Sequence, residues 1–359
     1  MPVSIDRHRA QIAAILEGWG MPPANAAAAA DGIAWADFRG VKSHGISKLP
    51  GYDVWRRDGR IRVEGTPRIE RETPVSALVD GDGGLGYAAG RLAMQTAIAK
   101  AQASGIGAVS ARNSAHFGAC GFYTEMAVEA GLIGLVTTGT AACSVAPTLG
   151  MEAKLGTDPI SFGAPAEGDD YFLLDMATTT VAQGKILNLF VENQSCPPGW
   201  ILNAAGADST DTRDYFDNGG FITSLGGSLL GSSYKGYGLS VMVNILSACL
   251  SGSSLITDPL HARRPGHPNN IGHFFLALDP GLFREPADFR RDVSTLIDSL
   301  RATRPLDGAA PVMVAGDPER MAMAKYAKEG IDVAPNMKAK IRALAEDAGA
   351  PWLLEEAAV

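Results

Sequence analysis

The chain has 359 residues, a formal net charge of −8, and a composition of 46% hydrophobic and 19% charged residues. This length is sufficient for two domains, and the apolar fraction excludes an intrinsically disordered chain. The negative charge argues against a nucleic-acid partner, because neutralising phosphates requires a basic face. We therefore predict a globular protein that binds no nucleic acid.

Cysteine usage and the longest apolar run both favour a cytoplasmic protein without a membrane segment. None of the four cysteines stands at C-x-x-C spacing, so we predict buried reduced thiols, no disulfide framework and no metal site. The N-terminus lacks the apolar core of a signal peptide. The apolar run 236–250 contains Tyr, Ser and Asn and is too short to span a bilayer, which predicts a buried helix.

Residues 1–75 are predicted to be mainly helical. Apolar side chains recur at helical spacing within residues 5–18, and this segment ends near Gly18 and Gly20. Pro22 and Pro23 open an alanine-rich helix that continues to about Phe38. A third helix is expected within residues 44–58, broken or begun near Pro50.

From residue 76 onward, short apolar strands alternate with helices, which is typical of a layered α/β sheet. We predict strands at 76–80, 106–110 and 133–137 with helices at 88–104 and 119–130, and later strands at 160–164, 172–175 and 274–278. Irregular segments rich in Gly and Pro separate the later strands, so the sheet is expected to be mixed rather than purely parallel.

The chain is predicted to become helical again after residue 285. Helices are expected at 289–303, 320–329 and 336–348. The sequence therefore predicts a mainly helical domain built from residues 1–75 and 285–359, around a central α/β domain of residues 76–284.

Residues 81–86 formally match the G-x-G-x-x-G pattern of a dinucleotide-binding turn, but the rest of that fingerprint is missing. The pattern requires an acidic residue at the end of the second strand to bind the ribose hydroxyls. Here that strand continues as Val-Ser-Ala-Arg-Asn, without Asp or Glu. We therefore interpret Gly81–Gly86 as a structural turn. The alternative is a conventional Rossmann dehydrogenase, in which Gly83→Ala would abolish cofactor binding.

A polar cluster between the second and third helices contains the first set of candidate catalytic residues. Ser43 and His44 form a Ser-His-Gly sequence in which the hydroxyl can fix the tautomer of the imidazole. Lys48 follows four residues later, so on a helix it projects from the same face. An imidazole that transfers a proton and a cation that binds a carboxylate are what a reductase of 2-oxo acids needs. The alternative is a surface histidine that caps a helix.

A second candidate lies where a strand ends and a glycine-bearing turn opens a helix. His116 occupies this turn, and the amides of the following helix N-terminus can bind a phosphate or a carboxylate. Lys235 precedes a flexible glycine at the start of the apolar helix, which makes it a candidate ligand for a cofactor phosphate.

Eight motifs in the same order resemble the malate/L-lactate dehydrogenase family, type 2, over nearly the whole chain. The motifs are Ser43-His-Gly45, Asn113-Ser-x-His-Phe-Gly118, Gly156-Thr-x-Pro159, Asp175-Met-Ala177, Gly184-Lys-Ile186, Pro198-Gly-Trp200, Lys235-Gly-Tyr-Gly238 and Ile271-Gly-His-Phe-Phe275. Together they are far more specific than any one of them.

The resemblance implies a non-Rossmann α/β/α fold for the cofactor domain, NAD or NADP as cofactor, and a homodimer. It implies that the helical domain contributes to the substrate site and to the dimer. His44 would be the proton donor, assisted by Ser43, while His116 would lie beside nicotinamide and substrate, and some members assign the acid/base role to it. The segments that would contact the cofactor are His116-Phe117-Gly118, Thr140, Asp175-Met176-Ala177, Lys235 and Gly316-Asp317-Pro318.

Three positions depart from what the resemblance implies. Lys48 stands where the family usually has Arg, and it lacks the planar fork that binds a carboxylate through two parallel bonds. Gly139 stands where Asn is common, and Asp158 replaces Asn in a turn that also accepts Asp.

These departures leave three functional readings open. The first is hydride transfer from NAD(P)H to a small 2-oxo acid, with His44 as proton donor and Lys48 and His116 as substrate-binding residues. The second is reduction of a cyclic 2-imino acid such as piperideine- or pyrroline-2-carboxylate. The third is a catalytically silent protein that keeps the nucleotide site. The choice between NAD and NADP is also open, although Arg263, Arg264 and His267 are basic enough to meet a 2′-phosphate.

Overall fold

The computed structural model describes residues 2–257 and 266–355. Its main feature is a seven-stranded sheet in the order β1-β2-β3-β10-β4-β5-β6. Only β2 and β3 run parallel, and every other neighbouring pair is antiparallel. The predicted α/β fold with a mixed sheet is therefore confirmed, and this sheet is not the parallel sheet of a Rossmann domain.

The strands of the large sheet are β1 Arg68–Glu72, β2 Ser76–Asp80, β3 Ile106–Ser114, β4 Ile133–Thr138, β5 Ile160–Pro165, β6 Tyr171–Met176 and β10 Ile271–Leu278. A small sheet contains β7 Ile201–Leu202, β8 Asp208–Ser209 and β9 Phe221–Ile222. The helices are α1 Ile5–Gly18, α2 Pro23–Phe38, α3 Leu49–Arg57, α4 Gly86–Ser104, α5 Cys120–Glu129, α6 Gln183–Val191, α7 Thr212–Phe216, α8 Tyr234–Asn244, α10 Pro286–Arg301, α11 Asp317–Glu329 and α12 Pro335–Asp347.

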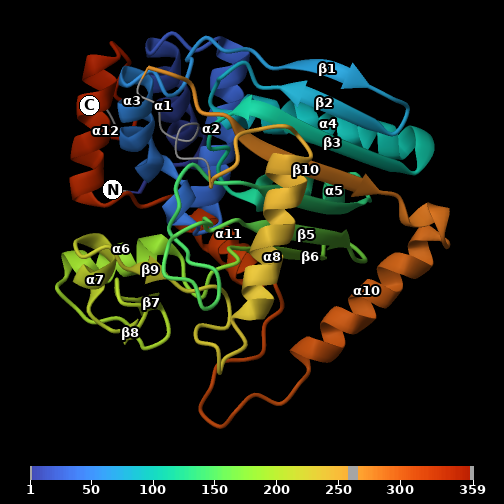
Figure 1. The fold of residues 1–359 in the computed structure, drawn as a ribbon. Coiled ribbons are helices and arrows are strands. Elements are labelled where there is room, and N and C mark those ends of the chain that lie inside the picture. The colour runs from blue at the N-terminus through green and yellow to red at the C-terminus, as the bar shows by residue number, and fades with distance from the viewer. Residues whose placement is uncertain (1, 258–265, 356–359) are drawn as a thin grey trace.

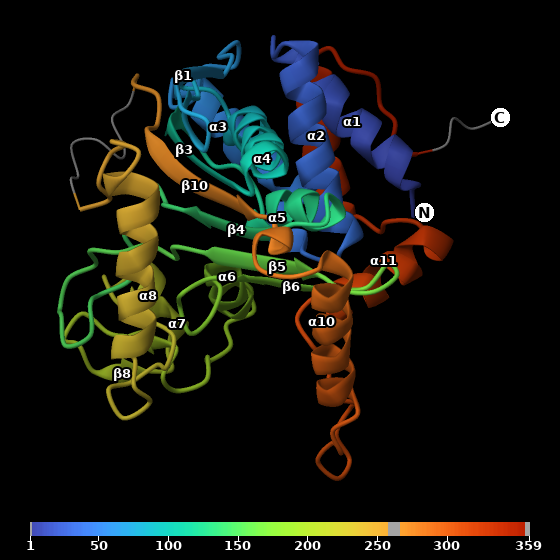
Figure 2. The ribbon, with the colours of Figure 1, turned by 90° about the vertical axis from the view of Figure 1, so that its right-hand side faces the viewer.

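Helices pack on both faces of the large sheet through their apolar side chains. Helices α4 and α5 cover one face of the sheet, α8 and the π-helical turn Ile245–Cys249 cover part of the other, and α1 and α2 lie outside α4 (Figure 2). Small side chains allow this close packing: α2 is alanine-rich and buried on most of its surface. The predicted helix at 236–250 thus divides into α8 and a π turn.

The terminal helices pack together, but α10 does not join them. Helix α12 contacts α1 and α3, whereas α10 packs against β5 and β6 and extends away from the body of the molecule (Figure 1). Strand β1, in the predicted helical segment 1–75, pairs with β2. The division into two domains at these boundaries stays a prediction.

Several predicted elements differ in extent from those observed. The third helix begins at Leu49, after two short 3-10 turns, Lys42–His44 and Ile46–Lys48. Strand β3 continues to Ser114, because the antiparallel strand β10 pairs with it as far as that residue. This extension brings His116 to the end of the sheet.

The glycine-rich turn at 81–86 is structural. The Gly81 amide donates to the Arg112 carbonyl at 2.8 Å and the Gly83 amide to the Asn113 carbonyl at 2.7 Å. A Cβ on Gly86 would lie 2.3 Å from the Ala115 carbonyl oxygen, so this position needs glycine for close backbone packing. Two of the turn's amides are therefore committed to the neighbouring strand end rather than available to a phosphate.

Candidate active site

The Ser43-His44 segment is held in place by a buried carboxylate. Asp37, at the end of α2, accepts hydrogen bonds from the Ile46 amide at 2.7 Å and pairs with His8 Nε2 at 2.8 Å. Any side chain at Gly45 would collide with Asp37, since an added Cβ would lie 1.9 Å from its Oδ1. The glycine of the Ser-His-Gly sequence therefore lets this loop fold tightly onto α2.

His44 and His116, predicted from separate motifs, lie side by side. Their rings are nearly parallel, at 18°, with centroids 5.6 Å apart. Ser43 Oγ lies 3.0 Å from His44 Nδ1, as the sequence predicted for a hydroxyl that fixes the imidazole tautomer. Both rings are half-buried, so each retains an edge that a small ligand can reach.

Lys48 gives this site its positive charge. Burial and the charge of Lys48 lower the pKa of His44 to about 4, and burial lowers the pKa of Lys48 itself. Burial also lowers the pKa of His116, with a further contribution from Lys48. Both histidines are therefore neutral near pH 7, and Lys48 is a cation available to an anionic ligand.

Behind His116 lies a third histidine that sequence analysis did not single out as functional. His273, on β10, is fully buried, and its ring stacks on Phe117 at 4.4 Å between centroids. Its Nδ1 is 2.6 Å from Thr138 Oγ1 and its Nε2 is 2.8 Å from Ser114 Oγ. Burial lowers the pKa of His273 to about 3, so it is a neutral packing residue that supports the His116 turn.

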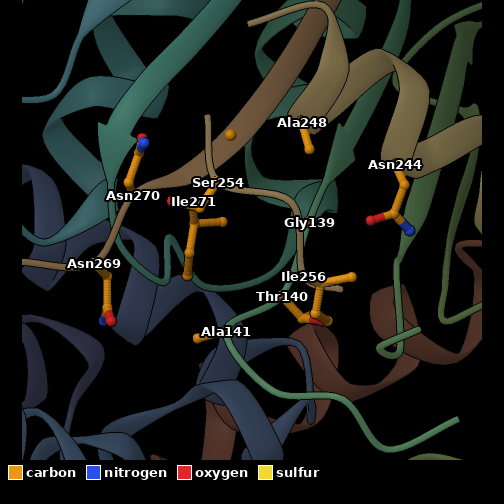
Figure 3. Close-up of a pocket in the computed structure, with 11 residues that line it drawn as sticks. Gly139, Thr140, Ala141, Asn244, Ala248, Ser254, Ile256, Asn269, Asn270 and Ile271 are labelled. Carbon is orange, nitrogen blue, oxygen red and sulfur yellow. The ribbon is translucent and has the colours of Figure 1, made fainter. Parts of the chain in front are cut away.

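A crevice opens at the same end of the sheet. It lies where β4 ends and β10 begins, and Ile271 in its wall pairs with Ser114, two residues before His116. Figure 3 shows Asn269 and Asn270 on one side of it and Asn244 and Ala248 on the other. Its enclosed part holds about 10 Å³, room for about one water.

One polar group in the crevice wall, the Asn269 side-chain amide nitrogen, is buried without a hydrogen-bond partner. The Thr140 hydroxyl is also buried, and it lies against the Asp158 carboxylate, where it opposes the rise in pKa that burial causes. Unsatisfied buried polar groups are rare, and each calls for an explanation such as a ligand. A hydroxyl or carboxamide group of a nicotinamide riboside has the chemistry to satisfy the Asn269 amide, so the polar lining of the crevice is compatible with NAD(P).

The asparagines of the crevice were missed by the motif analysis. Asn269 and Asn270 directly precede β10, and the Asn270 side chain accepts from the Asn113 amide at 2.7 Å. Their position just before a predicted strand could have indicated a place in the site, because residues at the ends of neighbouring strands lie close together at the edge of a sheet.

Other predicted cofactor residues have structural contacts in the described chain. Asp175 accepts from the Gly121 amide in the first turn of α5 at 2.7 Å and so caps that helix, while Met176 pairs with Ile160. Ala177 follows β6 and is half-buried. The Phe117 side chain is buried between His273 and Tyr123, and Gly118 has a positive φ of 85° in the same turn.

Lys235 and the Gly316–Pro318 turn lie away from the two histidines. Lys235 is exposed at the start of α8, nine residues and about 14 Å along the helix from Asn244 in the crevice. Asp317 pairs with Arg301 and Arg320 beside Asp170, which precedes β6 at the end opposite Met176. Arg263 and Arg264 lie outside the described residues, and His267 is exposed.

Within residues 2–257 and 266–355, no group of three or more His, Cys, Asp or Glu side chains is arranged to hold a metal ion. No helix in that part of the chain is long and apolar enough to span a bilayer.

Comparison with known sequences identifies relatives over most or nearly all of the chain. The family model described as malate/L-lactate dehydrogenase matches residues 3–342. A malate dehydrogenase of Pyrococcus horikoshii is 37% identical over 350 residues, covering 97% of this chain and 96% of that protein. An NAD⁺-dependent ureidoglycolate dehydrogenase of Escherichia coli O157:H7 is 32% identical, covering 88% and 87%. An NADP⁺-dependent (2R)-3-sulfolactate dehydrogenase of Chromohalobacter salexigens is 31% identical, covering 76% and 79%.

Solved structures agree with the sequence relatives. Malate dehydrogenase from Entamoeba histolytica superposes with a TM-score of 0.92 at 31% identity, covering 98% of this chain and 99% of that one. Δ1-Piperideine-2-carboxylate reductase from Pseudomonas syringae pvar. tomato superposes with a TM-score of 0.84 at 26% identity, covering 96% and 100%. The similarity therefore includes both the helical layers and the sheet.

Proposed function

The chain belongs to the malate/L-lactate dehydrogenase family, and from this premise we propose that it transfers a hydride between NAD(P) and a small 2-hydroxy acid with His44 as the proton carrier. The family resemblance predicted from eight motifs is thus confirmed, and with it an NAD(P)-dependent oxidoreductase. The observation that carries the proposal is the group of His44, His116 and Lys48 at the end of the sheet where the crevice with the unsatisfied Asn269 amide also opens.

Each residue of this group has a role that its chemistry supports. Lys48 would pair with the substrate carboxylate, and His116 would bind a substrate oxygen. In the oxidative direction, neutral His44 would accept the hydroxyl proton on Nε2 while the C2–H bond breaks and its electron pair leaves to nicotinamide. His44 then holds its other hydrogen on Nδ1, from which it donates to Ser43 Oγ.

The lowered pKa of His44 fits a proton acceptor. At pH 7 its neutral form predominates because burial and Lys48 disfavour the cation. Bound carboxylate would neutralise Lys48 and relieve this repulsion, so a substrate would raise the pKa of His44 toward the value a proton carrier needs. The same event would make the reverse, reductive reaction accessible.

The cofactor would lie against Thr140 and the asparagines of the crevice, and when bound it supplies a carbon that accepts or releases hydride. His116, Phe117 and Gly118 are proposed to contact it at the strand end. Asp175-Met176-Ala177, Lys235 and Gly316-Asp317-Pro318 remain proposed contacts on the family resemblance alone. The chain thus contributes binding, orientation and a proton path, while the hydride chemistry is that of the nicotinamide.

The first experiment follows oxidation and reduction of both NAD and NADP with a panel of small acids. The panel contains malate, lactate, ureidoglycolate and sulfolactate, with their 2-oxo forms and piperideine-2-carboxylate. We expect turnover with at least one 2-hydroxy acid, and a loss of about two to four decades in His44→Ala. Cofactor binding without turnover of any member would contradict the proposal. Turnover of the cyclic imine alone would instead favour the imino-acid reductase.

We also propose that the protein is a homodimer. Apolar side chains on the outer face of α10, among them Leu296 and Leu300, are 62% and 45% exposed, and Ile245 and Leu250 beside α8 are 54% and 59% exposed. Exposed apolar surface on a projecting helix is typical of a subunit interface, and a second copy of the chain is the partner we assign.

A cytoplasmic location is proposed on the buried thiols. Cys120 is fully buried, and burial raises its pKa well above the usual value, which keeps the thiol protonated and inert. Cys196 is likewise a buried thiol, whereas Cys143 and Cys249 are exposed, so the prediction of buried thiols is wrong for these two. The buried cysteines need no oxidising compartment.

A further inference from the structure

The hydrogen-bonding state of His116 can be read from its neighbours. Its Nδ1 lies 3.3 Å from the Gly118 amide nitrogen, which donates to it, and 2.6 Å from the Tyr52 hydroxyl. A backbone N–H can only donate, so Nδ1 must carry a lone pair rather than a hydrogen. The Tyr52 hydroxyl must then also donate to Nδ1.

A second tyrosine completes the chain of donors. Tyr87 Oη lies 3.1 Å from Tyr52 Oη. Because the single hydroxyl hydrogen of Tyr52 is committed to His116, Tyr87 must donate to Tyr52. Both tyrosines are almost completely buried, at 2% and 0% exposure, and burial raises the pKa of each, so both remain protonated donors. The direction of the bonds is therefore Tyr87 to Tyr52 to His116.

The surroundings of His116 also oppose its protonation. An imidazolium would place a hydrogen on Nδ1 against the Gly118 amide, which cannot accept, and would require Tyr52 to turn its own hydroxyl hydrogen away. The groups that face its ring are Lys48, His44 and His273, of which Lys48 is cationic and both histidines are neutral near pH 7. The part of the chain that the structure describes places no carboxylate on this ring that would stabilise a cation.

From this geometry we propose that Tyr52 is a positioning residue that locks His116 in the neutral tautomer with hydrogen on Nε2, so that His116 donates a hydrogen bond to a substrate oxygen and transfers no proton. His116 Nε2 is then the ring edge left for the substrate. The proton of the reaction passes through His44 alone. This inference rests on the proposed function for the identity of the substrate, but the tautomer itself is a property of the free protein.

With the role proposed for His44, the two neighbouring histidines would have opposite tautomers. His44 would hold hydrogen on Nδ1, toward Ser43, and offer Nε2 as an acceptor, whereas His116 offers Nε2–H as a donor. Their nearly parallel rings put an acceptor and a donor beside one substrate. His44 can then accept or return the proton, while His116 holds the substrate oxygen in place through a hydrogen bond.

The tautomer is tested directly by nitrogen NMR of the full-length protein labelled with ¹⁵N-histidine. His116→Gln identifies the His116 resonances by their loss. We expect an unprotonated Nδ1 and a protonated Nε2 on His116 at pH 7, unchanged on acidification as long as the protein stays folded. In Tyr52→Phe we expect the tautomer with hydrogen on Nδ1 to appear beside the native one, because the remaining Gly118 amide, at 3.3 Å, is the weaker of the two donors. Tyr87→Phe is the matched control, because it removes the outer hydroxyl only, and it should leave the His116 tautomer unchanged.

The role of His116 is tested by a pair of variants in the active enzyme. His116→Asn keeps an N–H donor, whereas His116→Ala does not. We expect Asn to retain at least about tenfold more kcat/KM than Ala, because a donor role needs no titration. Tyr52→Phe should lower kcat/KM about tenfold and add a second ionisation to its pH profile.

Two results would overturn the proposal. One is a hydrogen on Nδ1 of His116 in the native protein. The other is equal loss of activity in His116→Asn and His116→Ala, as expected for an acid/base residue. Because the NMR result needs no substrate, a failure of the proposed activity would leave the tautomer assignment standing, and the two failures can be told apart.

Discussion

At the scale of a single residue, Lys48 is proposed to affect both substrate binding and the protonation of His44. It lowers the pKa of His44, after the larger effect of burial, and is the cation proposed to bind the substrate carboxylate. Lys48→Met should raise KM about 10- to 100-fold through loss of a charged hydrogen bond. It should also raise the pKa of His44, since one of two causes of its lowering is removed.

The direction in which kcat/KM changes with pH follows from the protonation state of His44 that oxidation or reduction requires. Oxidation requires neutral His44, so kcat/KM of the native enzyme should fall only as the pH drops toward about 4. In Lys48→Met this fall should begin at higher pH. Lys48→Arg keeps the charge and serves as the control, with its acid limb in the native position. An unmoved acid limb in Lys48→Met would argue against this coupling of Lys48 to His44.

At the scale of elements, a buried ion pair connects α2, the helix that precedes the Ser-His-Gly loop, to α5. Arg39, at the end of α2, pairs with Glu125 on α5 at 2.6 Å, and both side chains are at most 9% exposed. Tyr171 also donates to Glu125, at 3.0 Å. Since α5 begins four residues after His116, this pair joins the segments that carry the two histidines.

Arg39→Met should therefore be costly. Removing one partner of a buried pair leaves the other charge uncompensated, and we expect the free energy of unfolding to fall by about 3 kcal/mol. Arg304→Met is the control, because Arg304 and Asp307 form a pair that is 85% and 92% exposed and should contribute little. Urea denaturation of both variants gives the comparison. Equal free energies of unfolding for the two variants would mean that the Arg39–Glu125 pair does not stabilise the contact between α2 and α5.

Elements with a strong apolar pattern were predictable, and those without one were not. Strands β2, β4, β5 and β6 and helices α1, α2, α4 and α5 lie within a few residues of their predicted positions. Strand β1 was missed because all five of its residues are exposed, so no alternation marks it. The two-residue strands of the small sheet are shorter than any sequence period.

Site residues that belong to short local motifs could be predicted from the sequence. Those brought to the site only by the tertiary fold could not. Ser43, His44, Lys48 and His116 were found from local patterns, and the structure brings them together. Tyr52 is 64 residues from His116, and no local spacing relates them. His273 and Asn269 likewise reach the site only because β10 inserts between β3 and β4.

At the scale of the whole molecule, the question is what covers α10. If a second copy of the chain packs on its apolar face, Leu296→Glu with Leu300→Glu should convert a dimer into a monomer in sedimentation velocity. Val54→Glu, at an exposed apolar position on α3, is the control and should remain dimeric. A native protein that sediments as a monomer at micromolar concentration would refute the homodimer.

The central claim is that hydride passes between C2 of a 2-hydroxy acid and nicotinamide in the site that contains His44. The most direct measurement uses the 2-hydroxy acid found in the panel, deuterated at C2, with oxidised cofactor in ordinary water. The account predicts reduced cofactor that carries one deuterium on its nicotinamide ring, with a slower rate than for the undeuterated acid. Reduced cofactor without deuterium would show that the hydrogen exchanged with solvent, and would contradict direct hydride transfer.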